Sequence, residues 1–348
     1  MKKMLSSVLA VTLMSSLLMT GCSSSESTST STEEGATQTA QTDSSNEESY
    51  DIGIIQLTEH PALDAARDGF IQGMADNGLV EGENVTIDTQ NAQNDQSNLK
   101  TIAQKFVSDD KDLVLAIATP AAQSMAAETT EIPILVTAVT DPAESGLCES
   151  NDAPGGNITG TSDLTPIADQ IELLQQILPD AKNVAILYNS GEQNSVIQAD
   201  MAEEAATELG ITTERKTVTN TNDVAQVTSS LIGNFDAVYI PTDNTLASSM
   251  PLVSSITNPA GLPVIVGEQG MVENGGLASV AVNYTDLGIM TGEMAAEILL
   301  NGADPAQMPI EYTENPQLIV NEDAAAELGI TIPDDVLTNA EIVNTVTQ

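Results

Sequence analysis

The segment Asp51-Ile-Gly-Ile-Ile-Gln-Leu57, followed by a polar loop and the stretch from Pro61 to Asn77, decides the fold of this chain. The first segment is a short apolar run of the kind that forms buried β-strands. Apolar residues then recur at helical spacing, at Ala62, Ala65, Ala66, Phe70 and Met74. Gly78 follows where a helix commonly ends. The sequence therefore predicts a strand, a loop and a helix in that order.

The same order recurs along two similar halves of the chain. In the first half we expect further strands at 84–89, 113–118, 133–136 and 158–160, and helices at 96–108 and 121–128. In the second half we expect strands at 184–188, 212–217, 237–240, 264–266, 277–282 and 318–320, and helices at 167–178, 195–209, 223–232, 246–258, 286–301 and 323–328. Apolar strands that alternate with amphipathic helices indicate parallel sheets. The expected fold class is α/β, with two doubly wound, Rossmann-like lobes joined by crossovers.

Six polar loops follow predicted strands and open predicted helices, at 56–60, 119–123, 137–141, 189–195, 241–245 and 267–270. Ligands of open parallel sheets bind beyond the carboxyl ends of the strands. A helix start there also presents free backbone N–H groups. Any one Ser, Thr or Asn in such a loop serves equally well as an ordinary helix cap. Because all six loops lie on the same side of the sheets, we expect a ligand cleft between two lobes that close by hinge motion.

The first fifty residues predict export and a membrane anchor. Lys2 and Lys3 precede an apolar run from Met4 to Met19, and the chain then reads Met19-Thr-Gly-Cys22. This order is typical of a bacterial secretion signal and resembles a lipobox, in which Leu is more usual than Met19. An uncleaved membrane-spanning helix is the alternative, but the run is shorter than the roughly 20 residues that such a helix needs. We expect a signal peptide at 1–21, lipidation of Cys22 and a disordered Ser/Thr/Glu-rich tether over 22–49.

Charge and rare residue types exclude several classes of function. Nine Lys and Arg face 51 Asp and Glu, a net charge of −42, which repels phosphate backbones and argues against a nucleic-acid partner. His60 is the only histidine, and Cys148 is the only cysteine besides Cys22, so no Cys/His cluster is available for zinc. Neither a Gly-x-Ser-x-Gly turn nor a Gly-x-Gly-x-x-Gly loop after the first strand is present. We therefore expect no enzyme, no cofactor and no metal.

Several of these segments resemble the substrate-binding lipoproteins of ABC transporters, in the tryptophan-type family. The most specific parts are Ile54-Ile-Gln-Leu-Thr-Glu-His-Pro-Ala-Leu-Asp64 and Leu187-Tyr-Asn-Ser-Gly-Glu-Gln-Asn-Ser195. Further matching segments lie at 67–70, 78–85, 118–123, 139–142 and 156–163. The likeness runs from about Asp51 to Leu337, and it departs at Ser190, where the family more often has Pro.

The resemblance implies the type I periplasmic binding protein fold. It also implies capture of a small molecule, most favourably an aromatic amino acid, and its delivery to the permease and ATPase subunits of an importer. The expected lobes are 50–162 with about 283–303, and 163–282 with about 304–348. A lipid anchor on Cys22 would hold the protein at the outer face of the cell membrane. The alternatives are a sensor component that docks on a membrane receptor, and a nucleoside or sugar-type ligand in place of the amino acid.

An amino-acid carboxylate requires N–H groups and hydroxyls. The helix start at Thr119, Ala121 and Ala122 offers these groups, and Thr140 faces it from the end of the next strand. We therefore expect the ligand carboxylate to bind at these four residues.

An amino-acid ammonium requires carboxylate or amide oxygens, and Asp243, then Glu268, then Asp163 are the candidates. Tyr188 and Tyr284 lie near strand ends, where a ring could line an aromatic ligand. We expect further ligand contacts in the first polar loop and at the start of the helix after Tyr188, from Gln56, Glu59, His60 and Asn194.

Overall fold

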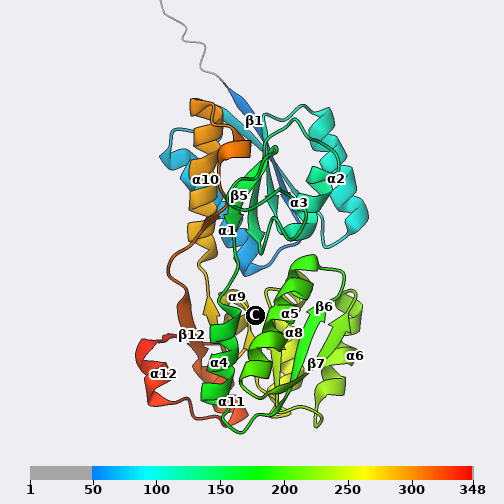
Figure 1. Cartoon of the computed structure of the whole chain (residues 1–348), viewed down its shortest axis with the longest axis vertical. Helices are drawn as coiled ribbons and strands as arrows, with labels where there is room; N and C mark the ends of the chain where they lie inside the picture. The colour runs from blue at the N-terminus through cyan, green and yellow to red at the C-terminus, as the bar shows by residue number, and fades with distance from the viewer. Residues whose placement is uncertain (1–48, 347–348) are drawn as a thin grey trace, which may run out of the picture. The chain divides into compact units, whose positions relative to one another are not determined.

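The computed structural model describes residues 49–346, whose strands form two sheets (Figure 1). The strand order is β11-β5-β4-β3-β1-β2 in the first sheet and β13-β12-β10-β9-β8-β6-β7 in the second. Within the described residues, every strand pair is parallel except β10 with β12. The predicted α/β fold with two lobes is therefore confirmed.

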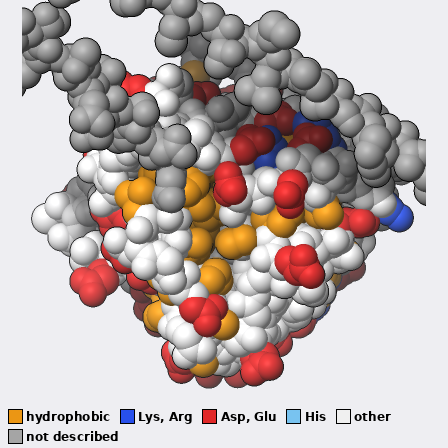
Figure 2. Space-filling model, turned by 90° about the horizontal axis from the view of Figure 1, so that it is seen from above, with side chains coloured by type: hydrophobic (Ala, Val, Ile, Leu, Met, Phe, Trp, Pro, Cys, Tyr) orange, Lys and Arg blue, Asp and Glu red, His pale blue; other side chains and the backbone are white. Residues whose placement is uncertain are grey.

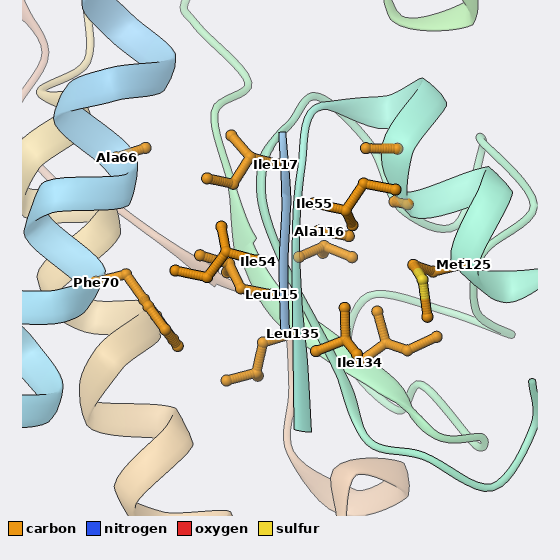
Figure 3. Packing of buried hydrophobic residues seen from close by; sticks show 14 of the residues in the cluster. Ile54, Ile55, Ala66, Phe70, Leu115, Ala116, Ile117, Met125, Ile134 and Leu135 are labelled. Carbon is orange, nitrogen blue, oxygen red and sulfur yellow. The ribbon is translucent and has the colours of Figure 1, made fainter. Parts of the chain in front are cut away.

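The first lobe is built on the six-stranded sheet. Its strands are β1 (Tyr50–Gln56), β2 (Val85–Asn91), β3 (Leu113–Ile117), β4 (Ile134–Val139), β5 (Ile158–Ser162) and β11 (Glu311–Tyr312). Its helices are α1 (Pro61–Asp76), α2 (Gln96–Ser108), α3 (Thr119–Ala126) and α10 (Tyr284–Asn301), with a 3₁₀ turn, η1 (Pro305–Gln307). Ile54 and Ile55 point to opposite faces of β1, toward α1 and α3 respectively (Figure 3). Helices cover both faces, so the central strands are apolar throughout rather than alternating.

Helices α1 and α10 pack with their backbones in close approach. A Cβ atom added to Gly288 on α10 would lie 2.1 Å from the carbonyl oxygen of Ala66, and one added to Gly73 on α1 would lie 2.3 Å from that of Ile289. Glycine is therefore required at both positions, because any side chain would push the helices apart. The two helices therefore pack in direct backbone contact.

The second lobe is built on the seven-stranded sheet. Its strands are β6 (Asn183–Asn189), β7 (Thr212–Val218), β8 (Ala237–Ile240), β9 (Val264–Val266), β10 (Ala278–Ala281), β12 (Gln317–Asn321) and β13 (Glu341–Val343). Its helices are α4 (Ile167–Ile177), α5 (Gln193–Glu208), α6 (Thr221–Leu231), α7 (Asn244–Ser248), α8 (Met250–Thr257), α9 (Gln269–Glu273), α11 (Glu322–Leu328) and α12 (Asp334–Asn339). Ile186 and Tyr239 are fully buried in this lobe.

The chain passes between the sheets three times, after β5, after β10 and after β11. The third passage corrects an expected boundary. We expected the chain to join the second lobe at about residue 304, but Glu311 still pairs with Thr161 in the first sheet. The passage therefore lies after Tyr312. Strand β11 has only two residues, both exposed, so no apolar pattern marks it in the sequence.

Acidic side chains are scattered singly over the face drawn in Figure 2. Most of the few basic groups within residues 49–346 are engaged in ion pairs, such as Lys105 with Asp88 and Asp109, and Lys111 with Asp51. Within residues 49–346 we find no helix with the length and apolar character needed to cross a membrane. The expected signal peptide, Cys22 and most of the tether lie outside the described residues.

Candidate ligand-binding site

A small closed pocket lies where the carboxyl ends of strands from both sheets meet. Its apolar walls come from Leu63, Ala138, Ala247 and Met271. Its polar walls come from His60, Asp163, Thr242, Asp243, Asn244, Glu268 and Tyr284. The centre of a water molecule has only about 10 Å³ in which to move, close to the minimum that holds one water. A larger molecule enters only when the walls move apart.

Two alanines at the ends of neighbouring strands have a left-handed backbone. Ala118, directly after β3, has φ 81°, and Ala138, in β4, has φ 54°. The pairing of β4 with β5 shifts register between Val136 and Val139, around Ala138. Such backbone conformations cost energy and cluster at binding and active sites. Here the irregular strand places Ala138 in the pocket wall.

Two buried carboxylates each keep one oxygen without a hydrogen-bond partner among the described residues. Asp163 accepts a hydrogen bond from the Tyr284 hydroxyl at Oδ2 (2.7 Å), and its Oδ1 has no partner. Glu268 accepts from the backbone N–H of Gly270 at Oε2 (2.7 Å), and its Oε1 has no partner. Burial raises the pKa of Asp163 above its ordinary value and the pKa of Glu268 to about 7. Both groups would gain from a hydrogen-bonding cation.

Asp243 also lines the pocket, but both of its oxygens are engaged. Oδ1 accepts the N–H of Leu246 (2.9 Å), and Oδ2 accepts the N–H of Asn189 (2.6 Å) and the hydroxyl of Ser195 (2.7 Å). Burial, and the nearby carboxylate of Glu192, raise the pKa of Asp243. Asp243 therefore ties α7, β6 and α5 together within the second lobe. Among the three ammonium candidates, Glu268 and Asp163 have the uncommitted oxygens, and Asp243, which we ranked first, has none.

His60 lies at the start of α1 and is 7% exposed. Its Nε2 lies 3.2 Å from Oδ1 of Asn244 in the second lobe, and its Nδ1 has no partner among residues 49–346. Burial is the main cause that lowers the pKa of His60 to about 4. The imidazole is therefore neutral at physiological pH.

Further polar contacts join the lobes around the pocket. The amide of Asn94 donates from Nδ2 to the hydroxyl of Thr245 (2.9 Å), and Gln198 donates from Nε2 to the hydroxyl of Thr140 (2.9 Å). Together with the His60–Asn244 contact, these bonds hold the lobes in a closed arrangement.

The structure places the expected carboxylate site at the start of α3 outside the wall of the closed pocket. The N–H groups of Ala121 and Ala122 both donate to the carbonyl oxygen of Ala118 (3.1 Å each), so the first turn of the helix uses them. Thr119 is fully buried and its hydroxyl has no partner among the described residues. Thr140 is engaged with Gln198. None of these four residues lines the closed pocket.

Four other predicted contacts also lie outside the pocket wall. The Gln56 amide donates to Thr58 and Asp64, which fixes the loop before α1. Glu59 is exposed, and Tyr188 packs in the apolar core of the second lobe. Asn194 is buried and donates from Nδ2 to the carbonyl oxygen of Thr242 (2.9 Å), behind the wall.

Sequence reasoning found Asp243 and Glu268 but missed other residues of the pocket wall on the side of the second lobe. Asn244, Thr242 and Met271 line the pocket, and the carboxylate of Glu192 holds the start of α7 from behind. Asn244 and Thr242 belong to a polar loop that we singled out, so their neighbourhood was visible. The burial of Glu192 depends on how α5 meets α7, which no local pattern encodes.

A second pocket, open to solvent, shares Glu268 and Tyr284 with the closed one. Its volume is about 220 Å³, and its other walls come from the starts of α1, α9 and α10. Glu268 and Tyr284 therefore stand between a closed and an open space.

Comparisons with known proteins agree with this architecture. The family model of the ABC transporter substrate binding protein matches residues 51–344. A tyrosine-binding protein from Clostridioides difficile strain R20291 is 42% identical over 329 residues, which cover 94% of this chain and 93% of that protein.

Two solved structures align over 85% of this chain and the whole of their own chains. A domain from Streptococcus pneumonia in complex with L-Trp is 38% identical, with a TM-score of 0.82. A ligand-free, open substrate-binding protein with adhesive properties from Clostridium difficile is 46% identical, with a TM-score of 0.66. The open protein thus has the higher sequence identity to this chain but the lower TM-score.

Proposed function

The chain belongs to the family of ABC transporter substrate-binding proteins, as its sequence predicted, and from this premise we propose that it captures an aromatic L-amino acid for import. Proteins of this family bind solutes and are not enzymes, and they serve ABC importers outside the cytoplasm. The relatives named for tyrosine and crystallised with L-Trp support an aromatic amino acid as the ligand.

The observation that carries the proposal is the pair of uncommitted carboxylate oxygens, Asp163 Oδ1 and Glu268 Oε1, in one closed pocket. A buried carboxylate oxygen without a donor is costly, and a primary ammonium supplies both donors and opposite charge. A neutral sugar supplies donors but no charge. The ligand ammonium therefore binds between Asp163 and Glu268 in our proposal.

The side chain of the ligand then lies against Leu63, Ala247, Met271 and the ring of Tyr284. These groups provide apolar surface and one aromatic face. The pocket is too narrow for this ligand as it stands, so the lobes must part to admit it. The contacts between the lobes, and the greater similarity to the L-Trp complex than to the open protein, support the closed state as the one described here.

Calorimetry with residues 50–348 and L-tyrosine, L-tryptophan, a nucleoside and a sugar tests the ligand. We expect tight binding of an aromatic amino acid, and Asp163→Asn or Glu268→Gln to weaken it by about tenfold or more, because each removes a charged partner. Asp169→Asn and Glu208→Gln are matched controls on exposed positions and should bind as wild type. Binding of only the nucleoside or the sugar would refute the amino-acid ligand.

We further propose that Cys22 carries a lipid that anchors the protein beside its permease. The charged start, the apolar run and the Met19-Thr-Gly-Cys22 sequence support this anchor. Substitution Cys22→Ser should move the protein from the membrane fraction to the medium or periplasm, while Ser24→Ala should leave it in the membrane fraction. A Cys22→Ser protein that stays in the membrane fraction would refute the anchor.

A further inference from the structure

Glu192 is a carboxylate that the pocket itself does not use. It directly precedes α5 and is 3% exposed, yet no basic side chain pairs with it in the described part of the chain. Its side chain does not cap its own helix. Burying a charge is costly unless several donors satisfy it, so the partners of Glu192 show what it does.

Every partner of the Glu192 side chain among the described residues is a donor, and four of these five donors belong to the first two residues of α7. Oε2 accepts the backbone N–H (3.1 Å) and the side-chain amide (2.6 Å) of Asn244. Oε1 accepts the backbone N–H (3.0 Å) and the hydroxyl (2.7 Å) of Thr245, and more distantly the amide of Asn189 (3.4 Å). Both oxygens of Glu192 act only as acceptors in these bonds, so Glu192 dictates the direction of each of these polar groups.

The direction matters because Asn244 and Thr245 make two of the contacts between the lobes. The hydroxyl of Thr245 gives its hydrogen to Glu192, which leaves its oxygen free to accept from Asn94 in the first lobe (2.9 Å). The amide of Asn244 turns its NH₂ toward Glu192, which leaves Oδ1 facing Nε2 of His60 (3.2 Å). Each contact would be lost if the Thr245 hydroxyl or the Asn244 amide pointed the other way.

The same chain of bonds sets the tautomer of His60. An oxygen at Asn244 Oδ1 requires Nε2 of His60 to carry the hydrogen. In a neutral imidazole, Nδ1 then has a lone pair and accepts, and this buried atom of the pocket wall has no partner within residues 49–346.

We propose that Glu192 is a positioning residue that orients Asn244 and Thr245 so that they lock the first lobe over the ligand and turn His60 Nδ1 into an acceptor for it. This inference rests on the proposed capture of an amino acid, whose ammonium supplies the donors. Glu192 itself does not touch the ligand.

The first test is the dissociation rate of L-tyrosine, or of L-tryptophan if it binds more tightly, from the Glu192→Gln protein. Glutamine has the same shape but turns an NH₂ group toward donors of Asn244 or Thr245. We expect koff to rise by about tenfold or more, with a much smaller change in kon. Glu208→Gln, on an exposed site of α5, is the matched control and should keep the wild-type rates. An unchanged koff in Glu192→Gln would overturn the role of Glu192 in closure.

The second test observes His60 directly by ¹⁵N NMR, which is unambiguous because the chain has one histidine. We expect the wild-type protein to show the Nε2-protonated tautomer, and Glu192→Gln to show a mixture or the other tautomer. An identical tautomer in both proteins would overturn the role of Glu192 at His60. This readout needs no ligand, so it decides on Glu192 even if the wild-type protein binds neither amino acid and the proposed function fails.

If Glu192→Gln does not fold, Thr245→Val and Asn94→Ala test the same lock from its two sides. Each single substitution should raise koff, and the double variant should raise it no further than the stronger single substitution. Thr245→Ser keeps the hydroxyl and should therefore keep the wild-type rate. Additive effects of the two substitutions, or no effect of either, would overturn the proposed lock.

Discussion

In the first lobe, His60 and Tyr284 stand at the starts of two helices whose backbones touch at glycines, whereas the second lobe lines the pocket with two buried carboxylates, Asp243 and Glu268. The first arrangement depends on close packing, which carries no charge and is insensitive to pH. The second depends on hydrogen bonds to groups that take up protons. One wall of the pocket therefore depends on helix packing and the other on the ionisation of carboxyl groups, so a substitution can disturb either wall without the other.

The largest effect is expected from breaking the packed wall with Gly288→Ala. The added methyl group would lie 2.1 Å from the carbonyl oxygen of Ala66, so α1 and α10 must separate. We expect a loss of roughly 3 kcal/mol in the free energy of unfolding, since overpacking outweighs the better helix propensity of alanine. Urea unfolding measures it, with Glu293→Ala on the exposed face of α10 as the control. Wild-type stability in Gly288→Ala would show that the helices yield easily.

The ionisable wall should make the ligand-free protein less stable as the pH rises. Burial raises the pKa of Glu268 from 4.5 to about 7 and raises that of Asp243 as well. Such groups stabilise the folded state most below their unfolded pKa values, and that contribution is lost as pH rises toward the folded values. His60 acts in the opposite sense, because its folded pKa of about 4 favours folding above pH 6.5 and less so as pH falls toward 4.

The two carboxylates outweigh the one histidine, so we expect stability to fall by roughly 2 kcal/mol between pH 5 and about pH 6.5, where the folded state holds about one more proton than the unfolded state. Urea midpoints at fixed high salt measure it, because salt screens the repulsion among the surface acids. The Glu268→Gln protein should show a flatter profile. A wild-type profile that rises over this range would contradict the burial of these carboxylates.

Much of the fold was predictable because apolar periodicity reports burial directly. The expected strand at 264–266 coincides with β9, and the expected helix at 96–108 with α2. The expected single helix at 246–258 is instead α7 and α8, which meet at Ser249 because Pro251 starts a new helix rather than continuing one. Strands β11 and β13 were missed because both strands are short and their residues are largely exposed.

The sequence predicted which loops reach the site, but not which of their atoms are free to bind a ligand. The loops that carry His60, Asp163, Asp243 and Glu268 all reach the pocket, as parallel-sheet geometry requires. Which carboxylate keeps a free oxygen depends on donors distant in the sequence, such as Asn189 for Asp243. Sequence patterns show residue types. Whether each polar atom finds a hydrogen-bond partner depends on how the lobes pack.

Ligand affinity should respond to pH in the opposite direction to stability. If the ammonium binds an ionised Glu268, the competent fraction of the protein rises as pH passes about 7. L-tyrosine should then bind about tenfold more weakly at pH 6 than at pH 8, in proportion to that fraction. Calorimetry at the two pH values measures the ratio, and Glu268→Gln should bind weakly at both. A wild-type affinity that is the same at pH 6 and pH 8 would remove Glu268 from contact with the ammonium.

The smallest effect is expected at His60, where the two walls meet. It belongs to the packed helix α1 but contacts Asn244 of the ionisable wall, and burial lowers its pKa to about 4. An NMR titration of this single histidine should therefore show no protonation between pH 8 and pH 5. Asn244→Ala removes the partner but not the burial, so the pKa should stay well below 6.5. A pKa near 6.5 in the wild-type protein would mean that solvent reaches the ring, and that the lobes part at His60 more readily than the packed wall implies.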